Sequence, residues 1–173
     1  METTSNREGE QSVPLSADQA PAISDAAVRV RALMLRIAEE LGVETSVDVH
    51  EDDQGVSAQF IGAELGSLIG ARGRTIDAIQ HLAYRTAHRA TEARGRVIVD
   101  AAGYRERRAV ALRAAGDQAA ERATSDHRSI ELEAMSALER KIVHEHLKSR
   151  RDVETYSQGE EPDRRLVVAP LVA

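Results

Sequence analysis

The amino-acid sequence predicts an α+β protein made of two small domains. Three observations lead to this class: an amphipathic helical pattern precedes two alternating segments that a turn joins, two glycines three positions apart lie between helical segments, and a second α/β unit follows residue 102. With 173 residues the chain can bury a real core. No run approaches 18 apolar residues and no signal-like segment opens the chain, so neither membrane insertion nor secretion is expected.

The first half of the chain gives a clear order of elements. The polar segment 1–23 carries two prolines and is expected to be a disordered tail. Ser24 can cap a helix that runs to Leu41, where Gly42 would stop it. Apolar and polar residues then alternate over 43–49 and 56–60, with turn residues between them, which predicts a β-hairpin.

The order continues with a short helix over 63–69, a glycine loop and a longer helix. The longer helix is expected from Thr75, as its cap, to about Thr91, and a short buried strand at 97–99 closes the unit. The second unit reads as a charged helix over 103–123, a strand at 128–132, a helix over 133–148 and two strands. These last strands are expected at 153–156 and 166–169, separated by a turn at 159–163.

The loop between the two middle helices has the chemistry of a phosphate site. Gly70 and Gly73 allow a sharp turn and a close backbone approach, and the following helix directs free N–H groups toward the loop. Ala71 lies between the glycines, and Arg72 and Arg74 add positive charge. We therefore take Gly70, Ala71, Arg72, Gly73 and Arg74 as candidate nucleic-acid-binding residues.

The spacing of the glycines excludes two other phosphate sites. A dinucleotide-binding fingerprint needs G-x-G-x-x-G directly after a strand, and a P-loop needs a glycine where this chain has Leu68. Helix, Gly-x-x-Gly, helix is the arrangement of a KH module, which clamps about four nucleotides of a single strand. The element order α-β-β-α-α-β is that of the type II KH arrangement.

The charge distribution agrees with a polyanionic ligand. The net charge is −6, but residues 62–113 hold ten arginines against five acidic residues, whereas residues 39–53 hold seven acidic residues and no Lys or Arg. Charges are screened beyond roughly 8–10 Å at physiological salt, so local charge matters more than the total. With one Phe, three Tyr and no Trp, an RNA-recognition motif that stacks bases on sheet aromatics fits poorly.

Arg140 and His144 form a second candidate contact. Four positions apart on one helix, they lie on the same face and can donate hydrogen bonds to a phosphate or a sugar hydroxyl. His144 and His146 point roughly 200° apart on that helix, so no metal site is expected there. The absence of cysteine excludes disulfides, Cys-zinc sites and thiol catalysis, and fits a cytoplasmic protein.

Two stretches carry a family resemblance. Leu68–Leu82 resembles the KH core of the bacterial Jag (SpoIIIJ-associated, KhpB) proteins, and Ile130–His144 resembles the small nucleic-acid-binding domain named for its Arg-x-x-x-His (R-3-H) motif. Val153–Arg165 is similar to the closing segment of the same family. The resemblance covers about residues 25–170 and matches a short form in which a polar tail replaces the N-terminal domain of longer members.

The resemblance implies a domain division and a function. A type II KH domain is expected over 24–102, and an R-3-H domain with a leading helix, its helices packed on a small three-stranded sheet, over 103–173. It implies a cytoplasmic, non-enzymatic protein without cofactor or metal that binds single-stranded RNA in post-transcriptional control linked to envelope growth and division. A small partner KH protein is a further expected partner.

The expected binding groove has Ile69 and Ile76 as its floor and strand 56–61 as its opposite wall. Two other functions stay open: a protein-interaction adaptor that keeps the KH scaffold and docks through the acidic stretch 39–53, and an enzyme. The enzyme is disfavoured because no nucleophile–base set is visible. Ser125, Asp126 and His127 are consecutive, so their side chains diverge.

Overall fold

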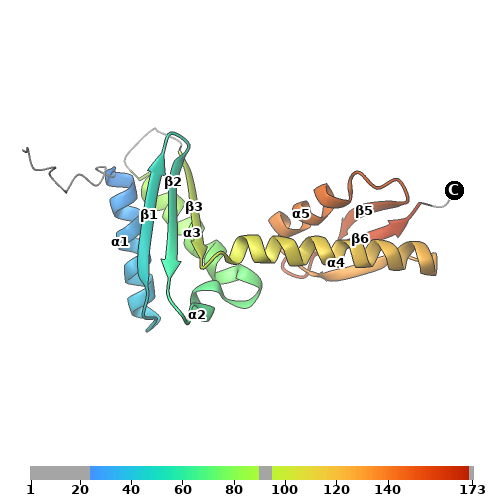
Figure 1. Ribbon diagram of the computed structural model, residues 1–173, viewed down its shortest axis with the longest axis horizontal. Coiled ribbons are helices and arrows are strands. Elements are labelled where there is room, and N and C mark those ends of the chain that lie inside the picture. Colours follow the sequence, from blue (N-terminus) through green and yellow to red (C-terminus); the bar gives the residue numbers. More distant parts are fainter. Residues whose placement is uncertain (1–23, 90–94, 172–173) are drawn as a thin grey trace, which may run out of the picture.

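The computed structural model describes residues 24–89 and 95–171. The predicted tail 1–23 therefore lies outside the described residues. The helix predicted to reach about Thr91 is shorter than expected, because it ends at Ala87 with His88 as its C-cap. Within the described residues the chain forms two α/β halves, and the long helix α4 (Tyr104–Asp126) runs from the first half into the second (Figure 1). The α+β class and the order of elements are confirmed.

The first half is a three-stranded sheet with helices on one face. The strands β1 (Ser46–Asp52), β2 (Gly55–Ile61) and β3 (Arg96–Ala101) lie in the order β1-β2-β3, with β1 antiparallel and β3 parallel to β2. The helices α1 (Asp25–Glu40) and α3 (Arg74–Ala87) pack on the sheet and on each other. Fully buried Phe60, Met34 and Leu68 are among the largest side chains of this first core.

The first helix begins and ends as expected, but the strand after it starts later than predicted. Ser24 caps α1 by accepting a hydrogen bond from the Ala27 amide. At the other end, Gly42 adopts φ +64°, and the Val43 amide donates to Ala38 O at 2.9 Å. This is a Schellman closure, and it uses the Val43 amide for the helix end. The alternation over 43–49 therefore overestimated the strand at its start.

Two helices differ from the predicted bounds for local reasons. The helix α2 (Gly66–Ile69) is one turn long, and α3 has Gly73 rather than Thr75 as its N-cap. The predicted cap at Thr75 is wrong because Thr75 already lies in the first turn of the helix. Between α2 and α3, Ala71–Gly73 forms a single 3₁₀ turn.

The second half has its own sheet and core. The strands β4 (Ile130–Ala134), β6 (Arg165–Pro170) and β5 (Val153–Gln158) lie in the order β4-β6-β5, and all pairs are antiparallel. The helices α4 and α5 (Ala137–Leu147) pack against each other and against this sheet. The second core contains Leu112, Val143, Leu147, Leu166 and Val168.

The helix α5 begins four residues later than predicted. Residues up to Ala134 stay in β4, where Ala134 pairs with Arg165 after a register shift. Ser136 then caps the helix by accepting a hydrogen bond from the Glu139 amide. The Glu139 carboxylate accepts one from the Ser136 amide, which completes a capping box. Both halves of the molecule contact the junction between β4 and α5, residues 133–136.

Candidate nucleic-acid interface

Both glycines of the predicted loop are required by its geometry. Gly70 has φ +72° and Gly73 has φ +76°, in the left-handed region that residues with a Cβ disfavour. A Cβ on Gly70 would lie 2.1 Å from Thr75 Oγ1, and a Cβ on Gly73 would lie 2.7 Å from the Tyr104 ring. The loop therefore passes against two side chains at positions where only a hydrogen atom fits.

The turn leaves donors free at the start of α3. The Gly73 amide donates to Gly70 O at 3.3 Å, but the Ala71 and Arg72 amides make no hydrogen bond within the described part of the chain. No side chain caps α3, so no capping group among the described residues compensates the positive end of its dipole. Arg74 is exposed and has no ion pair among the described residues. These groups together can hold an anion.

Arg72 does not project freely from the loop. Its backbone adopts φ +56°, and its guanidinium reaches the second half of the molecule. There Nη1 donates to Ala134 O at 2.9 Å and Nη2 lies 3.2 Å from Glu133 Oε2. The side chain keeps 50% of its surface exposed, so it can still contribute charge to the loop. Arg72 is thus both a loop cation and a contact between the two halves.

Arg140 is held inside the second half rather than on its surface. Its side chain is only 9% exposed. Nη1 donates to Met135 O at 2.7 Å, and Nη2 lies 2.7 Å from Glu161 Oε1 in the turn between β5 and β6. Arg140 therefore ties the start of α5 to that turn, and a ligand phosphate would have to share or replace the Glu161 carboxylate to reach the guanidinium.

His144 is the accessible member of the second predicted pair. It is exposed on α5, and its Nδ1 is hydrogen-bonded to Thr155 Oγ1 on β5. A groove of about 330 Å³ runs between α5 and β5 at this place. Its lining consists of Ala137, Arg140, Lys141, His144, Thr155, Tyr156, Ser157 and Leu166. The structure thus brings Arg140 and His144 to one groove, Arg140 at its buried edge and His144 at its open side.

Of the residues expected to line a groove beside the glycine loop, only some are accessible to a ligand. Ile76 is fully buried in the first core, so its prediction as a groove floor is wrong. Ile69 is half-buried. Strand β2 is hydrogen-bonded to β1 on one edge and to β3 on the other, so it offers side chains but no free backbone edge to a ligand.

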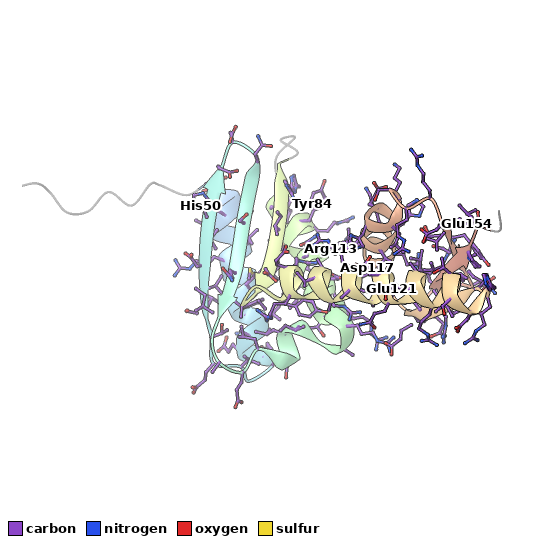
Figure 2. The ribbon with its side chains drawn as sticks, turned by 45° about the vertical axis from the view of Figure 1, so that its right-hand side comes forward. His50, Tyr84, Arg113, Asp117, Glu121 and Glu154 are labelled. Atoms are coloured by element: carbon purple, nitrogen blue, oxygen red, sulfur yellow. The ribbon has the colours of Figure 1, made fainter. Side chains whose placement is uncertain are left out.

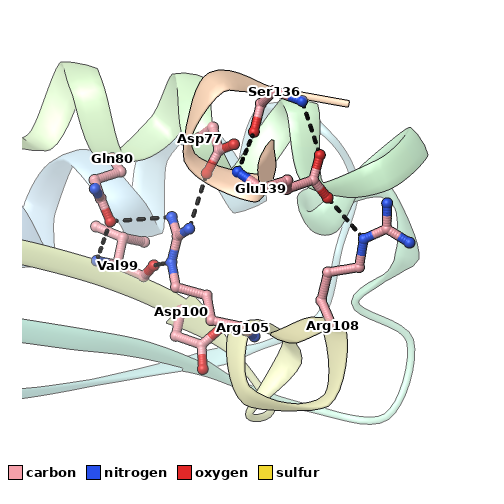
Figure 3. A network of polar contacts seen from close by, with 8 residues as sticks. All are labelled: Asp77, Gln80, Val99, Asp100, Arg105, Arg108, Ser136 and Glu139. Atoms are coloured by element: carbon pink, nitrogen blue, oxygen red, sulfur yellow. Dashed lines mark hydrogen bonds and ion pairs between the residues drawn. The ribbon is translucent and has the colours of Figure 1, made fainter. Parts of the chain in front are cut away.

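A network of polar contacts joins the first half to α4 (Figure 3). Arg105 at the start of α4 donates to Val99 O at 2.8 Å, to Asp77 Oδ1 at 2.9 Å and to Gln80 Oε1 at 3.0 Å. Three donors of one guanidinium therefore hold the helix to α3 and β3. The loop, which directly precedes α3, is positioned relative to α4 by this network.

The same end of α4 also holds α5. Arg108 Nε donates to Glu139 Oε1 at 2.7 Å, and the Glu139 carboxylate is also part of the α5 capping box (Figure 3). Farther along, Asp117 (Figure 2) accepts from His146 Nε2 at 2.9 Å. Because α4 contacts both halves through such side chains, the glycine loop and the start of α5 are held near each other.

Tyr104 lies at the junction of loop and helix. Its ring contacts Gly73, and its hydroxyl is buried without a hydrogen-bond partner among the described residues. Burial of the hydroxyl raises the pKa of Tyr104, because the phenolate form is poorly solvated there. A small cavity of about 80 Å³ next to it is lined by Arg72, Gly73, Tyr104, Ser136 and Leu138, among others.

Sequence reasoning missed the contacts that cross between the halves. The Ser136-x-x-Glu139 capping pattern was visible in the sequence and would have placed the start of α5. Nothing local in the sequence, however, indicates that Arg72 contacts Ala134 or that Arg140 contacts Glu161, because these partners meet only in the folded chain.

Neither a metal site nor a membrane-spanning helix is found in the described residues. In residues 24–89 and 95–171, no group of three or more His, Asp or Glu side chains is placed to hold a metal ion. Across the same ranges, no helix combines the length and the apolar character needed to cross a bilayer.

Comparison with known proteins agrees with this arrangement of two halves. The family model for the KhpA/KhpB KH domain matches residues 29–100, and the R-3-H domain model matches residues 110–170. The chain belongs to the KhpB family. Both KhpB-family domains are binding domains rather than enzymes. The first matched range ends in β3, and the second begins within α4.

Among its relatives are proteins named RNA-binding protein KhpB. The one from Lactiplantibacillus plantarum is 37% identical over 81% of this chain and 44% of its own length. Those from Clostridium symbiosum and Bacillus subtilis are each 33% identical, over 76% and 77% of this chain and over 60% and 65% of their own lengths. The chain thus spans between about two fifths and two thirds of the length of these KhpB proteins.

Proposed function

We propose that this KhpB-family protein binds single-stranded RNA, with the Gly70–Gly73 loop holding the sugar–phosphate backbone. The observation that supports this most strongly is the left-handed turn itself. The Ala71 and Arg72 amides make no hydrogen bond within the described residues, and no side chain caps the helix that follows. Arg74, the first residue of that helix, is exposed and has no ion pair in the same part of the chain. This is a site for a phosphate chain. The relatives from Lactiplantibacillus plantarum and Clostridium symbiosum, both named RNA-binding protein KhpB, support the same class of ligand.

The proposed roles differ between the candidate residues. Gly70, Ala71 and Gly73 shape the clamp, and Arg74 is its principal cation because it has no ion pair among the residues that the structure describes. Arg72 contributes through the exposed half of its side chain. His144 supplies the second contact, and Arg140 orients the segment next to it. Backbone contacts of this kind position a strand without reading its bases, so sequence preference is expected to be modest.

The protein acts in this proposal as a binding protein, not as a catalyst. Its cytoplasmic location, its link to envelope growth and division, and a small partner KH protein stay predictions that follow from the family resemblance. Sequencing of RNAs crosslinked to the protein in cells tests the cellular role: enrichment of transcripts for envelope and division proteins would support it.

Binding of a labelled oligouridylate, followed by fluorescence anisotropy at several salt concentrations, tests the clamp. Each phosphate contact to a single strand contributes roughly −0.7 to the log–log salt slope, so three or four contacts give about −2 to −3. Replacing Arg74 with Gln should make the slope less negative by roughly 0.7. Arg31→Gln is the control, since Arg31 is exposed on α1 and has no ion pair among the described residues. Equal effects of the two substitutions would contradict the clamp.

One observation favours a second function, a protein-interaction adaptor. The face of the first sheet that points away from α1 and α3 carries exposed Asp48, His50 and Asp52 on β1 within the acidic stretch. Figure 1 shows no helix over this face. The double variant Ala71→Asp with Arg74→Asp separates the two functions, because it keeps Arg72, which contacts the second half of the molecule. It should abolish RNA binding with the fold intact, whereas an adaptor would keep its partner.

A further inference from the structure

The two predicted contacts meet at one short segment of backbone. Arg72 from the loop donates to Ala134 O at 2.9 Å, and Arg140 donates to Met135 O at 2.7 Å. Carbonyl oxygens of consecutive residues are no more than about 6 Å apart. The two guanidinium groups therefore lie within roughly 12 Å of each other, on either side of the β4–α5 junction.

Helix α5 starts directly after this junction and separates two hollows. On one flank, Leu138, Glu139 and Ile142 line the small cavity next to Arg72 and Tyr104. On the other flank, Ala137, Lys141 and His144 line the groove against β5. At 100° per residue, the outer surface of the first turns of the helix between these flanks is formed by Leu138 and Lys141, and Glu145 follows one turn later on the same face.

The chemistry of Leu138 and Lys141 suits an unpaired nucleotide chain. Leu138 is 55% exposed, so its apolar surface is accessible to a ligand. Lys141 is exposed and has no ion pair within the described ranges. The side chain of Leu138 offers an apolar surface to a base, and Lys141 offers charge to a phosphate, one turn apart on the same helix.

We propose that a single RNA strand leaves the Gly70–Gly73 loop, crosses the first turns of α5 over Leu138 and Lys141, and enters the groove at His144. The two halves then form one continuous binding surface rather than two separate sites. Lys141 and Leu138 are binding residues on that path. The crossing rests on the proposed function, because it requires that the loop holds RNA.

Two labelled oligouridylates test the crossing, one of four and one of about ten nucleotides, because the loop alone clamps about four. The longer strand should bind with a steeper salt slope and with one strand per protein. Lys141→Gln should make that slope less negative by roughly 0.7 for the longer strand and leave the shorter one unchanged.

Lys148→Gln is the matched control. Lys148 is exposed at the far end of α5, pairs with Glu145 at 3.9 Å and does not line the groove. It should behave as the unsubstituted protein with both oligonucleotides. If the four-nucleotide strand binds but Lys141→Gln changes neither affinity nor slope, or if two long strands bind one protein, the crossing is wrong and the clamp stands. If neither oligonucleotide binds, the proposed function itself is wrong.

Discussion

Gly70 adopts φ +72°, and the space where a Cβ would lie is occupied by Thr75 Oγ1 at 2.1 Å. Backbone strain and steric overlap therefore act together at this residue, and both would be relieved only by moving the loop or the start of α3. Gly66, four residues earlier, has nothing within 4 Å of its virtual Cβ and lies in α2. Glycine is therefore required by the backbone geometry at position 70, whereas position 66 can accept a residue with a Cβ.

We expect Gly70→Ala to lower the free energy of unfolding by at least about 1–2 kcal/mol, because a residue with a Cβ is forced into a left-handed conformation against Thr75. RNA binding should fall with it. Gly66→Ala should leave stability unchanged or raise it by about 0.5–1 kcal/mol, because Ala favours the helix. Urea unfolding of the three proteins measures this. A stability loss in Gly66→Ala equal to that in Gly70→Ala would contradict the geometry.

Tyr104 has a buried hydroxyl without a partner among the described residues, and burial raises its pKa. An unfolded tyrosine ionises near pH 10, so above that pH the unfolded state loses this proton first. The stability linked to the protonated form is therefore complete below about pH 10 and is lost as pH rises through the raised pKa of the folded state.

The variant Tyr104→Phe should be at least as stable as the parent at neutral pH, because it removes an unpaired buried hydroxyl that costs about 1–3 kcal/mol. Above about pH 10 its advantage should grow, since it has no phenolate to expose. Urea unfolding at neutral and alkaline pH checks this, and the other ionisable groups cancel because both proteins share them. A difference that does not change with pH would count against the burial of this hydroxyl.

At the scale of elements, α5 depends on a carboxylate that serves two purposes. Glu139 accepts from the Ser136 amide at 2.9 Å to close the capping box, and from Arg108 Nε at 2.7 Å to hold α4. The residue is 8% exposed. Because Arg140 and His144 follow on the same helix, this carboxylate also positions the proposed second contact.

We expect Glu139→Ala to lower the free energy of unfolding by about 2–3 kcal/mol, since it removes one capping bond and leaves Arg108 without its carboxylate. Glu145→Ala is the control: Glu145 is exposed on the same helix, and its pair with Lys148 at 3.9 Å should be worth under about 1 kcal/mol. Chemical denaturation compares the two. Similar losses in both variants would show that the capping box contributes little.

The whole molecule is organised by α4, which begins against the first half and ends in the second core (Figure 1). Arg105 anchors its start through Val99 O, Asp77 and Gln80. Arg72 adds a direct contact between the loop and the β4–α5 junction. The relative placement of the two halves therefore depends on a few guanidinium groups rather than on a shared apolar core.

Replacing Arg105 with Ala should loosen the two halves, because three hydrogen bonds are lost at once. We expect a loss of about 2 kcal/mol from the first half and a broader or divided thermal transition. Small-angle scattering should report a wider distribution of shapes. Arg113→Ala, which removes only the exposed pair with Glu106 at 3.6 Å, should change neither measurement. Cooperative unfolding of Arg105→Ala as in the parent would contradict the anchoring role.

Local chemistry in the sequence was enough for the class, the element order and the loop. Ser24, Gly42 and the two loop glycines act through their own backbone geometry or through neighbours a few residues away, so they could be identified without the fold. The start of β1 was predicted too early because the Val43 amide closes the preceding helix. The start of α5 was predicted too early because β4 continues to pair with β6.

The partners of the charged residues and the close packing of the helices were decided only by the tertiary structure. Arg72 meets Ala134, Arg140 meets Glu161, and a Cβ on Gly116 in α4 would lie 2.8 Å from Val143 Cγ1 in α5. Residues that are distant in the chain become neighbours only when two elements pack, and a guanidinium in the sequence carries no sign of which carbonyl it will reach. The sequence by itself therefore determined the glycine turn and the cations next to it, whereas folding decided which of these cations have no ion pair among the described residues.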